Sequence, residues 1–177
     1  MAQRSVKKGA TGRGGEGPKN NHLEAPKYWL MKTEPSVFSI EDLKRLKTAP
    51  WDGVRNYQAR NFMRDMRIGD QVLIYHSNAK PTGVAGLGRI TGAARPDSTA
   101  WDPANIHHDP RSTPDRPVWD LVDVAYVSTF AEVLALDELR QRPELAGMLL
   151  FNRSRLSVQP VSAEHFAAIV ALASVQP

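Results

Sequence analysis

The hydrophobic positions of the chain fall into short runs with alternating strand-like and helix-like spacing. An apolar, aromatic run over 28–34 predicts a buried strand that Pro35 ends. Ser39 followed by Asp42 matches a capping box, which predicts a helix over about 40–47. The same spacing rules predict further strands at about 71–76, 83–90, 119–130 and 157–161, and further helices at about 57–66, at 137–142 and after Ser162.

Strands and short helices interleave here without a repeated crossover pattern. This order predicts a mixed α/β (α+β) fold, a small and mostly antiparallel β-barrel with peripheral helices. Gly83, Gly86 and Gly88 lie within one predicted strand and indicate bulges or tight bends. Residues 96–117 contain five prolines and predict a long connection, which in compact domains is usually functional or mobile.

Charge and composition divide the chain in two. Residues 1–26 are rich in glycine, poor in large apolar residues and carry +3 of the formal +4 charge. Such a segment cannot bury enough surface to fold, so we expect a disordered basic tail followed by a single domain over 27–177. The domain is nearly neutral, which argues against tight binding to long duplexes through phosphate contacts.

Several functional classes are disfavoured by composition. The chain has no cysteine, which excludes disulfides, a thiol nucleophile and thiolate metal sites. No apolar run approaches the roughly 20 residues that span a bilayer. We therefore expect a soluble, cytoplasmic and monomeric protein with no membrane partner, which could associate with a nucleoid. His107-His108-Asp109 lacks further ligands at a recognised spacing, so no metal or cofactor is expected.

The segment from Trp51 to Phe62 concentrates three aromatic rings, two guanidinium groups and three amides close to Gly53. A flipped or single-stranded base is commonly held by stacking on such planes, while amides and backbone groups read its edge. Trp51, Arg55, Asn56 and Tyr57 supply these groups within seven residues. The alternative is that Trp51 belongs to the core and Asn56 caps the helix that follows.

Four motifs in a fixed order strengthen the first interpretation. Residues 28–35, 51–57, 75–78 and 152–160 together resemble the EVE domain family, and the resemblance extends over about 27–175. It implies a PUA-like fold related to the YTH domain, with an aromatic-lined pocket for modified bases of DNA or RNA. The sequence contains no nucleophile elbow, phosphate loop, HExxH or paired-carboxylate motif, so we expect binding without catalysis.

The candidate site combines this resemblance with the residue chemistry. Similarity to the YTH fold implies that the backbone of Lys32-Thr33-Glu34 and Trp51 border the base, and Thr33 stands where relatives often have serine. The base-pocket candidates are Trp29, Lys32, Thr33, Glu34, Pro35, Trp51, Gly53, Val54, Arg55, Asn56, Tyr57, Tyr75, His76 and Ser77. The candidates for backbone and phosphate contacts are Arg60, Arg153, Arg155 and Ser157.

Each of these candidates has a structural alternative. Lys32 and Glu34 share a strand face and form a salt bridge in the simplest reading, whereas His76 is a structural histidine. Arg153 and Arg155 pair in the alternative with acidic residues of the long connection. In the functional interpretation that connection lines or covers the cleft through its acidic and aromatic residues, namely Asp97, Trp101, Asp102 and Asp109.

Two other functions stay open at this point. Lys32, Thr33 and Glu34 resemble the catalytic set of some ASCH-type amidohydrolases, in which a lysine of lowered pKa acts as a base. Adjacent strand residues point to opposite faces, however, which argues against Lys32 and Thr33 acting together. The third possibility is an adaptor for a protein partner, and an exposed apolar patch would favour it.

Overall fold

The computed structural model describes residues 25–175, so the predicted tail lies almost wholly outside the described residues. The strands are β1 (Tyr28–Thr33), β2 (Thr48–Trp51), β3 (Gln71–His76), β4 (Gly83–Pro96), β5 (Asp120–Ala135) and β6 (Val158–Val161). The helices are α1 (Ile40–Leu46), α2 (Tyr57–Asp65), α3 (Leu136–Arg140), α4 (Leu149–Asn152) and α5 (Ala163–Val175), with 3₁₀ turns η1 (Ser98–Ala100) and η2 (Pro143–Leu145). Within the described range no helix has the length and apolar character needed to cross a membrane.

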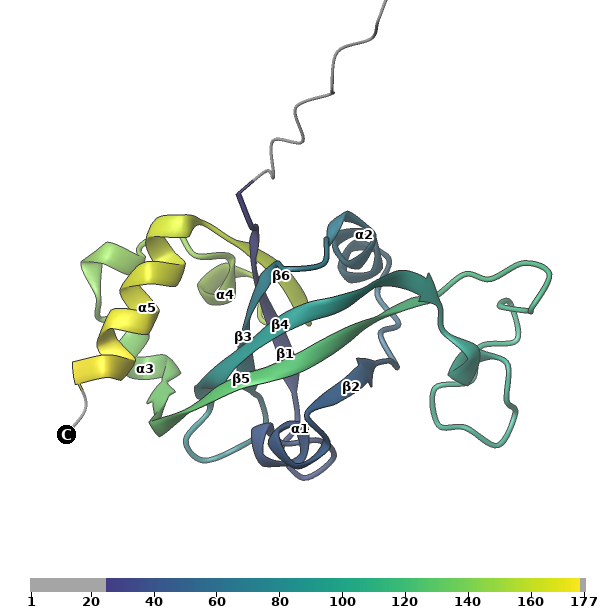
Figure 1. Ribbon diagram of the computed structural model, residues 1–177, viewed down its shortest axis with the longest axis horizontal. Coiled ribbons are helices and arrows are strands. Elements are labelled where there is room, and N and C mark those ends of the chain that lie inside the picture. Colours follow the sequence, from purple (N-terminus) through teal and green to yellow (C-terminus); the bar gives the residue numbers. More distant parts are fainter. Residues whose placement is uncertain (1–24, 176–177) are drawn as a thin grey trace, which may run out of the picture.

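A six-stranded sheet in the order β2-β5-β4-β3-β1-β6 forms the centre of the molecule (Figure 1). Every neighbouring pair is antiparallel except β1 and β3. The predicted mixed α+β, mostly antiparallel architecture is therefore confirmed. The sheet is strongly turned, so that β4 and β5 run across β1, but in the described part no ladder joins the edge strands β2 and β6.

Strand β1, which lies between β3 and the edge strand β6, is buried on both faces. Trp29 and Met31 point into a core beneath α1, α2 and β2, whereas Leu30 points into a second core with α3, α4 and α5. Figure 1 shows α3, α4 and α5 gathered at one end of the sheet and residues 97–119 extending from the other. Burial on both faces explains why β1 has a continuous apolar sequence without polar alternation.

Element boundaries differ from expectation at several points. Residues 48–51, for which the spacing predicts no strand, form the edge strand β2, where Pro50, a residue without an N–H, is tolerated. β4 extends to Pro96 rather than ending near residue 90, because the long β5 pairs with it throughout. The short elements η2 and α4 were not predicted, since their few residues carry no clear periodicity.

Local sequence signals in the first half hold well. Ser39 and Asp42 form the predicted capping box at the start of α1. The ladder between β4 and β5 shifts register around Gly86, as expected for a strand rich in glycine. A Cβ atom on Gly86 would overlap the carbonyl oxygen of Ser128, so the close approach of the two strands requires glycine there.

Candidate binding cavity

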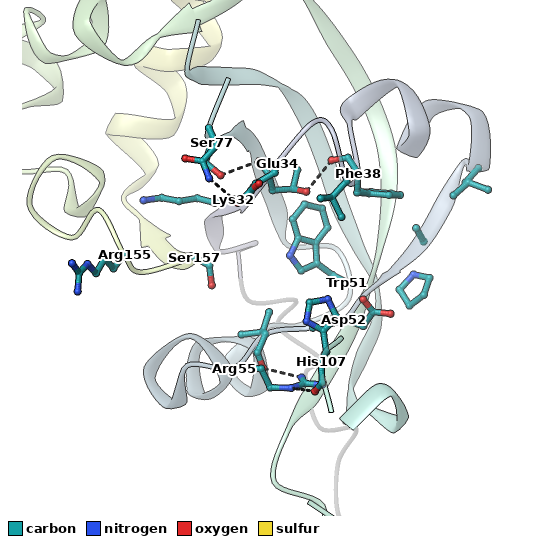
Figure 2. A pocket seen from close by; sticks show the side chains of 18 of the residues that line it. Lys32, Glu34, Phe38, Trp51, Asp52, Arg55, Ser77, His107, Arg155 and Ser157 are labelled. Atoms are coloured by element: carbon teal, nitrogen blue, oxygen red, sulfur yellow. Dashed lines mark hydrogen bonds between the residues drawn. The ribbon is translucent and has the colours of Figure 1, made fainter. Parts of the chain in front are cut away.

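A cavity of about 800 Å³ opens beside the end of β1, within the 300–1,000 Å³ typical of ligand pockets (Figure 2). Its wall combines residues from β1, β2, the turn after β3, the segment before β6 and the long connection. The lining residues are Lys32, Thr33, Glu34, Val37, Phe38, Leu46, Ala49, Pro50, Trp51, Asp52, Gly53, Val54, Arg55, Ser77, Asn78, His107, Ser154, Arg155 and Ser157. Ten of the eighteen candidate residues from the sequence are among them.

Trp51 lines this wall together with Phe38 and also belongs to the core beneath α1, α2 and β2, as the structural alternative predicted. β2 ends at Trp51, and pairing of β2 with β5 fixes where the indole lies. The ring packs edge-to-face with Phe38 at a centroid distance of 6.1 Å and is 7% exposed. Figure 2 places it in the middle of the labelled residues, with the indole nitrogen toward the side that Ser157 lines. The structure gives that nitrogen no hydrogen-bond partner among the described residues, so it remains a free donor at the cavity.

The turn after Trp51 is held by a buried carboxylate. Asp97 Oδ2 accepts hydrogen bonds from the Gly53 backbone N–H at 3.0 Å and from the Arg55 guanidinium at 2.8 Å. Its other oxygen accepts from the backbone and the hydroxyl of Thr99. Burial alone would raise the pKa of Asp97, but these hydrogen bonds outweigh it and lower the pKa below its ordinary value. Asp97 therefore stays ionised and joins the turn to the long connection.

His107 brings the long connection to the cavity. Arg55 Nε donates to the carbonyl oxygen of His107 at 2.7 Å, and the imidazole lies against Gly53. A Cβ atom on Gly53 would lie 2.7 Å from His107 Nε2, and φ at Gly53 is +72°. Glycine is therefore required by backbone conformation and by space. Of the four loop residues expected at the cleft, Asp97 lies behind the wall, and Trp101, Asp102 and Asp109 do not line it.

A second buried carboxylate anchors the far part of the connection. Asp109 accepts hydrogen bonds from Arg111 and, at 2.8 Å, from the indole nitrogen of Trp119. These contacts hold the pKa of Asp109 well below its usual range, with Arg111 as the largest cause. In the described part of the chain no three histidine, cysteine or carboxylate side chains gather as metal ligands would. The pattern His107-His108-Asp109 thus places one residue at the cavity and another at this anchor.

The three residues with an ASCH-like pattern have separate partners. Lys32 Nζ donates to the Ser154 carbonyl at 2.9 Å, and Thr33 Oγ1 donates to the Phe38 carbonyl at 2.8 Å. Glu34 accepts from Asn78 at 2.7 Å rather than from Lys32. Burial lowers the pKa of Lys32. Because the hydroxyl and the amine are committed to different carbonyls, the described structure shows no nucleophile–base contact here.

Two carboxylates line the cavity, those of Glu34 and Asp52. Burial and the neighbouring charge of Asp97 raise the pKa of Asp52, partly offset by His107 and Arg55. Asp52 forms no hydrogen bond or ion pair with another described side chain, in contrast to Glu34. It is therefore available as an acceptor at the cavity edge.

The segment before β6 contributes a cation. Arg155 and Ser157 line the cavity, whereas Arg153 does not. Both arginines are exposed, and within residues 25–175 neither forms an ion pair with the acidic residues of the long connection. The alternative of pairing across to that connection therefore finds no support in the described residues.

Several pocket candidates lie elsewhere, each with a structural role. Trp29 is buried in the core, where its indole nitrogen donates to Asp70 at 2.8 Å. Tyr75 is buried in the second core, with Lys32 Nζ 5.5 Å from its ring centre. His76 is buried and accepts from the Ile40 backbone N–H at 3.1 Å, and burial lowers its pKa. All three residues occupy buried positions of β1 or β3.

The remaining candidate residues that do not line the cavity lie in turns or in α2. Pro35 lies in the turn after β1 and Asn56 caps α2 by accepting from the Ala59 backbone N–H. Tyr57 stacks on the buried Trp119 with ring centres 4.8 Å apart, and Arg60 lies beside that pair. Tyr57 and Arg60 are close in sequence to the cavity wall, but they lie on α2 and do not line the cavity.

Sequence analysis did not find nine of the lining residues. They are Val37, Phe38, Leu46, Ala49, Pro50, Asp52, Asn78, His107 and Ser154. Asp52 and Ser154 stand between predicted site residues, so adjacency was a usable signal. No sequence signal indicated His107, because it is more than fifty residues from Gly53 in the chain and only the path of the long connection brings the two together.

The sequence and the fold of this chain are similar to those of known proteins. The EVE domain model matches residues 27–172. Thymocyte nuclear protein 1 of Mus musculus is 43% identical over 178 residues, covering 90% of this chain and 79% of that protein. A solved structure of a hypothetical protein from Leishmania major has a TM-score of 0.84 at 51% identity, covering 85% of this chain and 96% of that chain. The crystal structure of human THYN1 protein in complex with 5-methylcytosine-containing DNA has a TM-score of 0.81 at 43% identity, covering 85% and 99%.

These matches extend over nearly all of the described residues. The solved structures share the sheet and the flanking helices, so the expected PUA-like architecture with peripheral helices is confirmed. The order of the four motifs in the sequence thus identified the family correctly. The chain belongs to the EVE domain family.

Proposed function

We propose that this domain binds a single modified base of DNA or RNA in the cavity beside Trp51, without catalysing a reaction. The observation that carries the proposal is a cavity of about 800 Å³ lined by Trp51 and Phe38, at which the Trp51 indole nitrogen and the Asp52 carboxylate have no hydrogen-bond partner among the described side chains. The structurally similar human THYN1 is known in complex with 5-methylcytosine-containing DNA, which supports the same class of ligand.

The wall has the chemistry that base recognition requires. An indole supplies a flat apolar surface, and base–aromatic stacking contributes about 1–3 kcal/mol. The free indole nitrogen of Trp51 is a donor, and the carboxylate of Asp52 is an acceptor. A base edge that is removed from its pair needs both kinds of partner, because an unpaired polar group in a cavity costs about 1–3 kcal/mol.

Cations at the mouth suit the phosphate that accompanies a base. Arg155 is exposed, lines the cavity and has no acidic partner among the described residues. Ser157 lies on the same segment and supplies a hydroxyl. A guanidinium with two parallel N–H donors is well matched to a phosphate. We assign these two residues to the sugar-phosphate of the bound nucleotide.

Binding without catalysis fits the contacts of Lys32, Thr33 and Glu34. Each side chain holds a neighbouring segment through its own hydrogen bond, and these bonds shape the end of β1. Freeing the lysine or the hydroxyl for chemistry would remove a contact that the wall depends on. We therefore assign the three residues to the frame of the cavity.

The test is a fluorescence-anisotropy titration with labelled DNA and RNA oligonucleotides at fixed, stated salt. Each oligonucleotide is unmodified or carries 5-methylcytosine, 5-hydroxymethylcytosine or N6-methyladenine. The wild-type protein should prefer one modification. Trp51→Ala should weaken that binding by about one to two orders of magnitude, since it removes the stacking surface.

A folded Trp51→Ala variant that keeps the wild-type preference would show that the cavity is not the base site. Circular dichroism and a thermal melt establish that the variant is folded. If the wild-type protein binds all oligonucleotides equally and weakly, the reader function is wrong.

A further inference from the structure

A second aromatic surface lies outside the cavity, where α2 meets the long connection. Tyr57 stacks on the buried Trp119, with ring centres 4.8 Å apart and an interplanar angle of 32°. The guanidinium carbon of Arg60 is 4.9 Å from the Tyr57 ring centre and 5.9 Å from that of Trp119. These three side chains form a compact cluster that the cavity does not include.

Tyr57 keeps an exposed part of its ring despite its contacts with Trp119 and Arg60. If Arg60 lay on the face opposite Trp119, it would be about 10 Å from the Trp119 ring, since the two separations would add. The measured 5.9 Å instead places Arg60 beside the stacked pair. Tyr57 is 50% exposed. Contact with the buried Trp119 restricts the Tyr57 side chain. A ligand that stacks on the half-exposed ring therefore costs little further side-chain entropy.

The charge of Arg60 is not neutralised in the described structure. Its guanidinium donates to the Val118 carbonyl at 2.9 Å and to Asn61 Oδ1, both neutral acceptors. Nearby Arg64 and Arg111, in contrast, are paired with Asp120 and Asp109. Arg60 is therefore a cation held in a fixed orientation, available to an anion from outside.

The cluster is continuous with the cavity wall. Arg55 lines the cavity and its guanidinium carbon lies 5.7 Å from the Trp119 ring centre, while Arg60 lies 5.9 Å from the same ring. The two guanidinium groups are thus within about 12 Å of each other. Because nucleotides rise about 3.4 Å each along a strand, the two groups are at most about three to four nucleotides apart.

We propose that Tyr57 and Arg60 bind the nucleotides that flank the base held in the cavity. A neighbouring base stacks on the outer face of Tyr57, and a backbone phosphate pairs with Arg60. The occupant is a single-stranded or locally opened segment, because a stacked duplex does not offer a base face to Tyr57. This inference rests on the proposed function and assigns it a second contact surface along the strand.

The test compares ligand lengths. Binding of the preferred modified nucleotide is measured alone, as a trinucleotide and at the centre of a single-stranded 12-mer. The variants are Tyr57→Leu, which keeps an apolar side chain on Trp119 but removes the aromatic face, and Arg60→Gln. Arg142→Gln serves as a matched control, because Arg142 is exposed beyond α3 at the other end of the sheet.

In the wild-type protein and in Arg142→Gln, affinity should rise with length. Tyr57→Leu should lose about tenfold of the 12-mer affinity and leave mononucleotide binding unchanged. Arg60→Gln should weaken 12-mer binding and reduce its salt slope by about one. The preference for the modified base should survive in both variants.

An unchanged gain with length in both folded variants would overturn the inference and leave the surface to a protein partner. Failure of the proposed function is a separate result, because it appears as loss of modification preference in the wild-type protein. Thermal melts of each variant confirm that Tyr57→Leu has not released Trp119. If it has, Arg60→Gln and Arg60→Lys together decide the outcome by their salt slopes.

Discussion

The carboxylate of Asp97 binds the guanidinium of Arg55 at 2.8 Å across forty-two residues of sequence. Asp97 is fully buried, and its second strong donor is the backbone N–H of Gly53. The contact joins the start of the long connection to the turn that follows Trp51. The shape of the cavity therefore depends on an ion pair that lies behind its wall.

Replacement of Asp97 with asparagine should lower the free energy of unfolding by about 2–3 kcal/mol. The amide keeps one acceptor but leaves Arg55 without its charge partner in a partly buried position. Urea denaturation measures the change. Asp102→Asn, at an exposed position of the same connection, should change the stability by less than about 0.5 kcal/mol. Equal effects of the two variants would contradict this role of Asp97.

The same residue makes stability sensitive to acid. The pKa of Asp97 is lowered in the folded protein, so its contribution is present above the ordinary aspartate pKa of about 3.9. It is lost as the pH falls from there toward the lowered folded pKa. The unfolding free energy of the wild-type protein should therefore decrease below about pH 4 more steeply than that of Asp97→Asn. Parallel pH profiles for the two proteins would count against this assignment.

Gly53→Ala should destabilise the domain and weaken ligand binding. Its φ of +72° disfavours any side chain, and the new Cβ would lie 2.7 Å from His107 Nε2. Gly69→Ala is the matched control, because its φ is +98° with no atom within 4 Å of the added carbon. Both substitutions should cost about 1–2 kcal/mol from backbone strain. Gly53→Ala should cost more, and the added His107→Ala should recover the excess.

Trp29→Phe separates the buried tryptophan from the cavity tryptophan. It removes the hydrogen bond from Trp29 to Asp70, which should lower stability by about 1–3 kcal/mol. Ligand preference should persist, because the ring lies in the core and not on the cavity wall. Denaturation and oligonucleotide titration are run on the same preparation. A lost preference in a folded Trp29→Phe protein would place Trp29 in the site after all.

The variants Arg155→Gln and Arg153→Gln should differ in oligonucleotide binding, although the two residues are only two positions apart. Arg155 lines the cavity and Arg153 does not. Arg155→Gln should weaken oligonucleotide binding uniformly across sequences and reduce the salt slope by about one, as loss of a phosphate contact does. Arg153→Gln should leave both unchanged. Equal slopes for the two variants would remove Arg155 from the phosphate contacts.

Local sequence patterns were sufficient where a signal is carried by adjacent residues. Ser39 and Asp42 predicted the capping box, and the apolar run of β1 predicted a buried strand. Asn56 illustrates the opposite difficulty, because its position before α2 suited a helix cap and a base contact equally. The structure shows it capping the helix.

Distances between sequence-distant segments were not accessible in the same way. Trp29 and Trp51 looked alike as candidate walls, yet β1 is covered on both faces whereas β2 is an edge strand that ends at the cavity. The strand order β2-β5-β4-β3-β1-β6 decides this difference. It depends on pairings between segments far apart in the chain, which no periodicity records.

By itself, the sequence determined most of the strands and longer helices, the fold class and, through four ordered motifs, the family, because these follow from spacing and residue type over short stretches. The tertiary structure alone decided which candidates meet at one cavity. It carried Trp29, Tyr75 and His76 into the core and brought His107 to Gly53. The physical reason is that the cavity is formed by segments far apart in the chain. Sheet pairing and buried hydrogen bonds, such as those of Asp97, set the relative positions of these segments.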